Sequence, residues 1–180
     1  MGDGRETDLR CGRAAGSMGA MVVVRAVIAD DWQTLRDIRL AALREAPYAF
    51  GSTYAREVAF TEEQWRGRIN DRSVTYLAYL PENPEPVGLA GVYVENGVAD
   101  VVSLWVRPSA RGHGVGEALI GATADWAKAR SYACLLLWVT ESNTPARKLY
   151  DRCGFALTGQ RQPLPSDPTL PEVQMRRLLG

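Results

Sequence analysis

The sequence has 180 residues, which is enough for one domain with a full hydrophobic core. Apolar residues make up 46% of it and charged residues 23%, as in ordinary globular proteins. The formal net charge is zero, which argues against a nucleic-acid-binding surface and against electrostatic attachment to a membrane. No apolar run approaches the roughly 18 residues of a spanning helix. The N-terminus lacks the apolar stretch of a signal peptide, so we expect a cytoplasmic protein.

Cysteine and histidine usage narrows the chemistry further. The three cysteines, Cys11, Cys134 and Cys153, show no C-x-x-C spacing, which predicts reduced thiols. His113 is the only histidine in the sequence, so we expect no metal site. Residues 1–20 are rich in Gly, Arg and Asp and show no periodicity. They predict a disordered extension in front of a single domain at 21–180.

In the first half of the chain, apolar spacing and turn signals indicate a strand, two helices and two further strands, at 22–27, about 31–46, 62–70, 74–80 and 87–95. The segment Thr61–Gln64 has the capping-box pattern that opens the second helix. The segment 48–60 is expected to be a loop. Its aromatic residues either pack in the core or line a substrate groove; they are Tyr48, Phe50, Tyr54 and Phe60.

In the second half, Asn96-Gly97 predicts a hairpin turn into a strand at 98–106. We expect a helix at 117–130, a fully buried strand at 134–140, a short helix from Asn143 or Thr144 to Cys153, and strands at 155–160 and 172–178. A proline-rich loop at 163–171 separates the last two strands. This order of elements predicts a mixed sheet with helices on both faces.

A glycine-rich turn follows the strand at 98–106. It runs from Arg111 to Gly116 and leads directly into a helix. Glycines let a backbone approach a ligand closely, and the unpaired amides at a helix N-terminus favour an anion. The turn therefore predicts a phosphate-binding site.

Three phosphate-binding motifs compete for this turn. Gly112 and Gly114 fit the start of a dinucleotide G-x-G-x-x-G motif, but Glu117 occupies the third position and would repel a pyrophosphate. A P-loop requires a lysine, which the turn lacks. The remaining pattern is R-x-x-G-x-G, at Arg111, Gly114 and Gly116. It resembles the acetyl-CoA signature of the GCN5-related N-acetyltransferases, the GNAT superfamily.

A second stretch resembles another GNAT signature, N-x-x-A-x-x-L-Y-x-x-x-G-F, here at Asn143, Ala146, Leu149, Tyr150 and Gly154-Phe155. The two signatures stand in the family's order, with a helix and a strand between them. The resemblance covers most of 22–178. It implies an α/β GNAT fold with a six- to seven-stranded mixed, mainly antiparallel sheet and helices on both faces. The strands at 98–106 and 134–140 would splay apart around the pantetheine arm.

The resemblance also implies roles for individual residues. The cofactor-binding residues would be Leu104, Trp105, Val106, Arg111, Gly112, His113, Gly114, Val115, Gly116 and Asn143. Backbone amides of 111–116 would hold the pyrophosphate, and the strand would pair with pantetheine as an added strand does. One strand amide would polarise the thioester carbonyl. Tyr150 would be catalytic and protonate the departing thiolate. The side chain of His113 is expected to be solvated.

The resemblance implies an acetyl-CoA-dependent transfer to a primary amine, on a small molecule or a protein. An amine with a pKa near 10.4 is mostly protonated at neutral pH, so a base is useful. Asp100, Glu141 and a water chain remain open as that base. The alternative function is a non-catalytic acyl-CoA-binding regulatory module, and retention of Tyr150 favours the enzyme. A nicotinamide-binding protein is disfavoured by Glu117. We expect a monomer or homodimer with no nucleic-acid or membrane partner.

Overall fold

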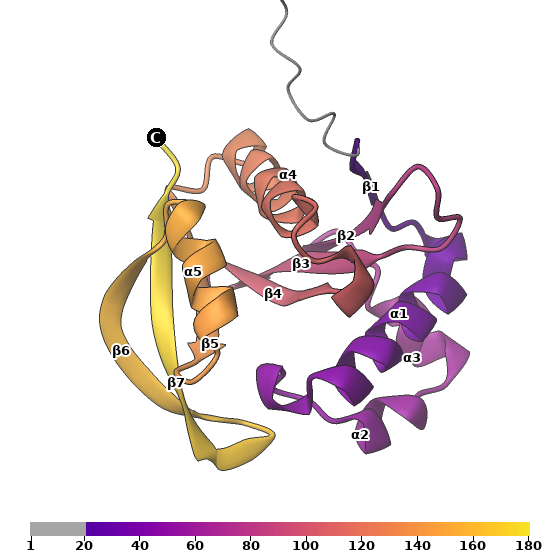
Figure 1. Ribbon diagram of the computed structural model, residues 1–180, viewed down its shortest axis with the longest axis horizontal. Coiled ribbons are helices and arrows are strands. Elements are labelled where there is room, and N and C mark those ends of the chain that lie inside the picture. The colour runs from indigo at the N-terminus through magenta and orange to yellow at the C-terminus, as the bar shows by residue number, and fades with distance from the viewer. Residues whose placement is uncertain (1–20) are drawn as a thin grey trace, which may run out of the picture.

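One seven-stranded sheet organises the computed structural model, which describes residues 21–180 (Figure 1). The extension expected at 1–20 lies outside the described residues. The strand order is β1-β2-β3-β4-β5-β7-β6. The strands are β1 (Val23–Ala26), β2 (Ser73–Tyr79), β3 (Gly88–Glu95), β4 (Val98–Val106), β5 (Cys134–Thr140), β6 (Ala156–Leu164) and β7 (Asp167–Leu178). The β4–β5 pair is parallel and the other pairs are antiparallel, which confirms the expected mixed, mainly antiparallel sheet.

Helices cover both faces of this sheet (Figure 1). Three lie on one face and two on the other: α1 (Trp32–Glu45), α2 (Tyr54–Val58) and α3 (Glu62–Gly67), then α4 (Val115–Ala129) and α5 (Thr144–Arg152). Helix α1 buries Leu35, Ile38, Ala42 and Leu43, the helical spacing seen in the sequence. Within residues 21–180, no helix is long and apolar enough to cross a membrane.

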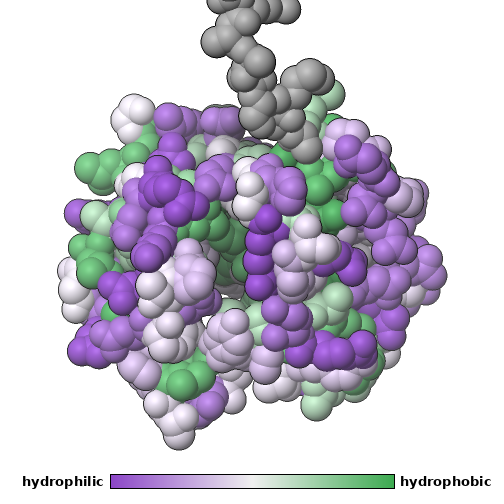
Figure 2. Space-filling model, viewed as in Figure 1, coloured by the Kyte–Doolittle hydropathy of each residue, from purple (hydrophilic) through white to green (hydrophobic). Residues whose placement is uncertain are grey.

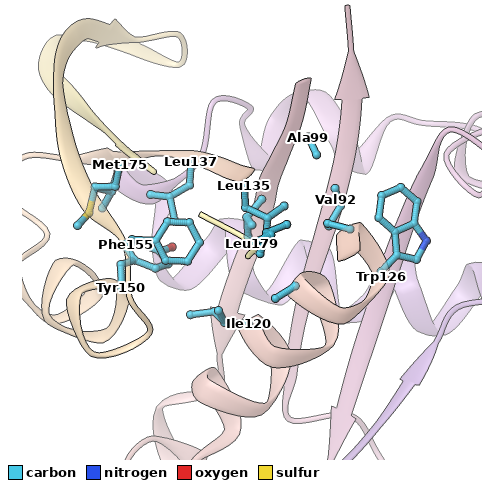
Figure 3. Close-up of a cluster of buried hydrophobic side chains, with 14 of the residues drawn as sticks. Val92, Ala99, Ile120, Trp126, Leu135, Leu137, Tyr150, Phe155, Met175 and Leu179 are labelled. Carbon is cyan, nitrogen blue, oxygen red and sulfur yellow. The ribbon is translucent and has the colours of Figure 1, made fainter. Parts of the chain in front are cut away.

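The core has a compartment on each face. On the α4–α5 face, Ile120, Leu135, Leu137 and Met175 pack together with the ring of Tyr150 (Figure 3). On the other face, α1 and α3 pack on Leu77, Leu89 and Trp105. The sheet is therefore buried on both sides along its middle strands. Strand β5 was expected to be fully buried, but its Cys134, Leu136 and Trp138 are only partly buried, and Trp138 lines both of the cavities described below.

Two segments expected to be loops contain regular structure. Within 48–60, α2 forms because Thr53 accepts a hydrogen bond from the Arg56 amide at 3.2 Å and caps the helix. The predicted capping box at Thr61 and Gln64 is confirmed. The prediction of a proline-rich loop at 163–171 is wrong, because β6 and β7 form a long hairpin that includes most of this segment. The prolines are tolerated because this end of β7 extends beyond β5 and pairs with the edge strand β6 alone.

A bulge in β4 shapes the centre of the sheet. The β3–β4 register shifts between the pairs Leu89–Trp105 and Gly91–Val102, and Ser103 lies there with φ of +60°. Because the extra residue reverses the side-chain alternation, Val101 packs on the α4 face whereas Trp105 packs on the α1 face. Among the described residues, β4 and β5 pair only at Asp100 and Leu136, and the two strands diverge beyond that pair.

Candidate active site

Two cavities meet where β4 and β5 diverge. The first, here called the glycine-loop cavity, has a volume of about 470 Å³ and lies between 104–106, the glycine turn, 138–140 and the start of α5. The second, the arginine cavity, has about 480 Å³ and lies between α1, α2, β4 and the β6–β7 hairpin. Both are lined by Ala49, Leu104, Trp138 and Tyr150, so these residues form the junction. Figure 2 shows a hollow on this face with hydrophobic surface at its floor and hydrophilic residues around its rim.

The glycine turn has the backbone that an anion cradle requires. Gly112 and Gly114 have φ of +81° and +77°, a region that residues with side chains rarely adopt. Among the residues that the structure describes, no heavy atom would lie within 4 Å of a Cβ at either position, so the turn is open toward the cavity. Gly114 is the N-cap of α4, and the first amides of a helix have no partner within it. These amides and the positive end of the helix dipole suit a phosphate.

Gly116 serves a different purpose from the other two glycines. A Cβ at Gly116 would lie 2.7 Å from Leu149 Cδ2, which is too close for unshifted packing. The glycine thus permits α5 to pack directly on the start of α4. The two sequence signatures, one at each helix, meet in space at this contact.

Arg111 directs its side chain away from the glycine turn. Its Nη2 donates to Glu45 Oε2 at 2.9 Å, and its Nε donates to the Val106 carbonyl at 3.0 Å. The indole of Trp105 donates to the same Glu45 oxygen at 2.8 Å. Any contribution of Arg111 to phosphate binding therefore comes mainly from its backbone. Nothing in the sequence marked Glu45 as the residue that holds Arg111 and Trp105 in place.

His113 is exposed and does not line the glycine-loop cavity. Its Nδ1 lies 3.0 Å from the Arg111 carbonyl, as expected for a solvated residue of the turn. Of the other predicted cofactor residues, Leu104, Trp105, Val106, Gly112, Gly114, Val115, Gly116 and Asn143 all line this cavity. Asn143 uses its side-chain oxygen to accept from the Ala146 amide at 3.3 Å, which caps α5.

Glu117 is not a free negative charge beside the turn. Arg152 Nη2 donates to its carboxylate at 2.8 Å, and this hydrogen bond holds the pKa of Glu117 below its ordinary value. Both residues line the glycine-loop cavity. Arg152 on α5 thereby compensates the charge of Glu117. The sequence did not reveal this pair, because the two residues are 35 positions apart.

Tyr150 lies at the junction of the two cavities. The residue is only 7% exposed, and its ring packs edge-on against Phe155 at 5.8 Å between centroids. Burial, with a smaller contribution from Cys153, raises the pKa of Tyr150 above its ordinary value. The hydroxyl is therefore protonated at neutral pH and can donate a hydrogen bond to a group at the junction.

Of the two carboxylates predicted as the base, only Asp100 lines a cavity. Asp100 lines the arginine cavity, and burial, with Glu95 adding to it, raises the pKa of its carboxyl group. Glu141 lines neither cavity and forms an ion pair with Arg161. A third carboxylate, Glu172, lines the arginine cavity at 6% exposure and accepts from Gln162 at 3.1 Å. Burial raises its pKa as well.

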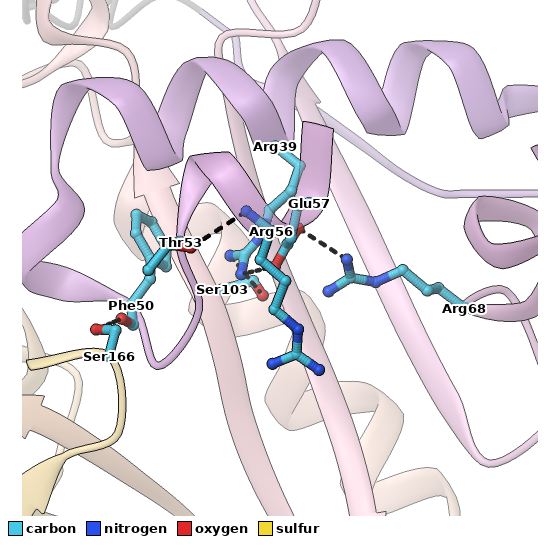
Figure 4. Close-up of polar contacts among 8 residues, drawn as sticks. All are labelled: Arg39, Phe50, Thr53, Arg56, Glu57, Arg68, Ser103 and Ser166. Carbon is cyan, nitrogen blue, oxygen red and sulfur yellow. Dashed lines mark hydrogen bonds and ion pairs between the residues drawn. The ribbon is translucent and has the colours of Figure 1, made fainter. Parts of the chain in front are cut away.

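A network of arginines on Glu57 forms the opposite wall (Figure 4). Arg39 binds the Glu57 carboxylate with two hydrogen bonds, of 3.0 and 2.8 Å, and Arg68 adds a third at 2.8 Å. Burial alone would raise the pKa of Glu57, but the hydrogen bonds and charges of both arginines outweigh it and lower the pKa to about 2. Arg39 also lies over the Phe50 ring, 4.7 Å from its centroid.

The aromatic residues of 48–60 divide between the two expected roles. Phe50 is buried and lines the arginine cavity with Phe60, whereas Tyr48 lines the glycine-loop cavity. Tyr54 instead accepts a hydrogen bond from Arg44 at 2.6 Å. The tip of the β6–β7 hairpin closes this side, because Ser166 donates to the Phe50 carbonyl at 2.5 Å (Figure 4).

A mixed sheet that opens between its parallel strands, beside a glycine turn at a helix N-terminus, is the arrangement of a GNAT fold. The chain belongs to the acetyltransferase (GNAT) family, whose model matches residues 32–155. GNAT acetyltransferases use acetyl-CoA as the acetyl donor. Described residues 21–180 contain no group of three or more His, Cys, Asp and Glu side chains that could hold a metal ion.

Curated relatives match over part of their length. A mycothiol acetyltransferase of Renibacterium salmoninarum is 24% identical over 79% of this chain and 43% of its own. A streptothricin acetyltransferase of Streptomyces lavendulae is 44% identical over 30% of this chain and 29% of its own. The chain thus spans less than half the length of either relative.

Solved structures match over most of this chain. A GNAT-family acetyltransferase from Streptococcus pneumoniae superposes with a TM-score of 0.71 at 20% identity, covering 89% of this chain and 100% of that one. A GCN5-related N-acetyltransferase from Kribbella flavida gives 0.66 at 27% identity, covering 88% and 98%. A Bacillus anthracis protein in complex with acetyl coenzyme A gives 0.54 at 25% identity, covering 62% and 66%.

Proposed function

We propose that this protein is an acetyl-CoA-dependent N-acetyltransferase that acetylates a primary amine by direct attack. The observation that carries the proposal is the junction, where a cavity suited to the cofactor and a cavity suited to an acceptor share Tyr150, a residue that is only 7% exposed. A protein that only binds acyl-CoA needs the first cavity but neither the second cavity nor a proton donor between them.

The glycine-loop cavity would hold the cofactor. Amides of 112–116 would bind the pyrophosphate, because the turn is open and the start of α4 points its amides toward it. The backbone of 104–106 borders the gap left by β5 and would pair with the pantetheine amides. The Val106 carbonyl already accepts from Arg111, so we assign the pairing chiefly to Leu104 and Trp105.

The reaction would take place at the junction. The neutral amine nitrogen attacks the thioester carbonyl carbon, the C–N bond forms, and the C–S bond then breaks. Tyr150 gives its proton to the departing thiolate and is reprotonated, directly or through water, by the proton that the attacking nitrogen loses once the C–N bond has formed. The proton that the ammonium form must lose would go to Asp100, directly or through water, because Asp100 lines the acceptor cavity and Glu141 does not. A backbone amide of β4 would stabilise the oxyanion.

Cellular location and assembly belong to the proposal too. Cys134 and Cys153 are both free thiols, which supports the cytoplasm as the location. A monomer or a homodimer is the proposed assembly.

Thermal unfolding with acetyl-CoA tests the cofactor half of the proposal. A ligand that binds only the folded state at a hundredfold excess over Kd stabilises it by about 2.7 kcal/mol. Gly114→Asp should abolish this shift by placing a negative charge beside phosphate. Gly114→Asn is the matched control, since asparagine has similar bulk, lacks the charge and tolerates a positive φ. Equal shifts in the two variants would remove the assignment of the phosphate site.

Release of CoA in the presence of a panel of amines tests the transfer itself. We expect release that depends on both acetyl-CoA and an amine, with the acetylated amine formed in equal amount. If acetyl-CoA binds but no amine in the panel is acetylated, the regulatory binding module becomes the better account.

A further inference from the structure

The arginine cavity has walls of unlike charge. The wall formed by the helices and the segments between them carries Arg39, Arg56 and Arg68 with Glu57, whereas the sheet wall carries Asp100 and Glu172. A cavity for a simple cationic acceptor, such as a polyamine, has no use for arginines. The charges on this wall therefore bear on what the acceptor contains.

Glu57 compensates only part of the positive charge on the helical wall. Its carboxylate accepts three hydrogen bonds, two from Arg39 and one from Arg68, and it is 1% exposed. Arg39 is buried at 6% exposure and is fully engaged by Glu57 and Ser103. One carboxylate thus faces two guanidinium groups, and the Arg68 side chain is still 36% exposed.

Arg56 adds a further guanidinium to this wall. It stands on α2 directly before Glu57, lines the cavity and is exposed. Its backbone amide caps the helix through Thr53, but among the described residues its side chain makes no hydrogen bond or ion pair. In Figure 4 the guanidinium of Arg56 extends away from the Glu57 carboxylate, on which Arg39 and Arg68 converge. Within residues 21–180, Arg56 is thus a charged donor without a partner at the cavity.

The sheet wall gives the cavity a negatively charged side opposite the arginines. Asp100 and Glu172 suit the ammonium end of an acceptor, and Gln162 already holds one oxygen of Glu172. An acceptor that spans the cavity would meet carboxylates on one side and guanidinium groups on the other. Guanidinium groups form strong, geometrically specific hydrogen bonds with carboxylate and phosphate oxygens.

We propose that the acceptor carries an anionic oxygen group, a carboxylate or a phosphate, in addition to its amine, and that Arg56 and Arg68 bind that group. The inference rests on the proposed transfer and names the class of its acceptor: amino acids, amino-acid-like metabolites or phosphorylated amines. A polycationic acceptor would leave these arginines facing like charge.

Matched acceptors test this inference. Three amines of equal length, 4-aminobutyrate, 1-aminobutane and 1,4-diaminobutane, isolate the effect of a carboxylate; phosphoethanolamine and ethanolamine do the same for a phosphate. We expect kcat/KM with the wild-type protein to be at least tenfold higher for the anionic member of one set. That set then identifies the anionic group as carboxylate or phosphate.

Variants link the preference to the residue. Arg56→Gln should reduce the ratio of kcat/KM between the anionic and the neutral acceptor by about tenfold or more, the loss of one charge-assisted hydrogen bond. Arg56→Glu should favour the diamine. Arg72→Gln is the control, because Arg72 is exposed and lines neither cavity, and it should leave the ratio unchanged. Preference for the diamine in the wild-type protein, or an unchanged ratio in Arg56→Gln, would overturn the inference.

A binding measurement separates this inference from the proposed function. If no amine is acetylated, calorimetry with CoA-saturated protein and two probes, N-acetyl-4-aminobutyrate and N-acetylphosphoethanolamine, decides the matter. Binding of either probe that Arg56→Gln weakens about tenfold or more would keep the anionic subsite while the transfer fails. Absence of binding by both probes would overturn the subsite.

Discussion

Arg39 donates a hydrogen bond from Nη1 to Ser103 Oγ at 3.2 Å, and this contact ties α1 to the bulge of β4. Ser103 holds a φ of +60°, which a residue with a side chain adopts only when its surroundings enforce it. Arg39 is itself fixed by two hydrogen bonds to Glu57 on α2. The next residue after the bulge is Leu104, at the junction of the two cavities. The buried ion pair thus supports the strand on which the proposed chemistry depends.

Replacing Arg39 should destabilise the fold strongly. Arg39→Met keeps most of the length of the side chain but leaves Glu57 buried with only Arg68 as a partner, so we expect a loss of about 3–5 kcal/mol. Urea unfolding measures it. Arg36→Met is the control, since Arg36 lies on the same helix and its contact with Asp37 is exposed; it should change stability by less than about 0.5 kcal/mol. Equal effects in both variants would show that the buried pair contributes nothing particular.

The ionisation of Glu57 should make the unfolding free energy of the protein depend on pH in the acid range. Its folded-state pKa is about 2, below the unfolded value near 4.3, so its contribution is fully present above about pH 4.3 and is lost as the pH falls through about 2. The contribution is on the order of 3 kcal/mol. The difference in unfolding free energy between wild type and Glu57→Gln should therefore be largest above pH 4.5 and shrink toward pH 2. A difference that does not vary with pH would contradict the assigned pKa.

Two glycines of α4 should respond to alanine in opposite ways. Gly121→Ala places a Cβ in open space within a helix, so we expect a gain of about 0.4–1 kcal/mol. Gly116→Ala drives a Cβ against Leu149 and should cost about 1 kcal/mol. Because Leu149 lines the glycine-loop cavity, Gly116→Ala should also weaken acetyl-CoA binding, whereas Gly121→Ala should not. Thermal unfolding with and without acetyl-CoA measures both effects. Equal gains in stability would show that the α4–α5 contact is loose.

Sequence reasoning succeeded where the signal is local. The glycine turn before α4, the Asn96-Gly97 hairpin and the capping box at Thr61 all depend on residues close together in the chain. The residues of the glycine turn and of the Tyr150 helix allowed the two stretches to be recognised as two signatures of the same family. The structure places them on two sides of the same cavity.

The features that were missed depend on distant residues. Arg39 and Ser103 are 64 residues apart, and nothing near either one marks the pair. Glu172 reaches the arginine cavity only because β7 lies beside β5 rather than at the sheet edge. Prolines suggested a loop at 163–171, because the sequence does not show that β7 extends past its neighbour there. The lining of the arginine cavity therefore could not be predicted from the sequence, because residues far apart in the chain form it.

The most direct test of the account is the turnover number of Tyr150→Phe with an acetylated amine as product. This change removes the hydroxyl and keeps the ring that packs on Phe155. A thiolate whose conjugate acid has a pKa near 8.5 leaves more easily when it receives a proton, and such acid catalysis contributes about 10² to 10⁴ in rate. We predict that kcat and kcat/KM fall together by that factor while the Kd for acetyl-CoA stays the same. A variant that turns over at the wild-type rate would contradict the role of Tyr150 and the assignment of the junction as the place of transfer.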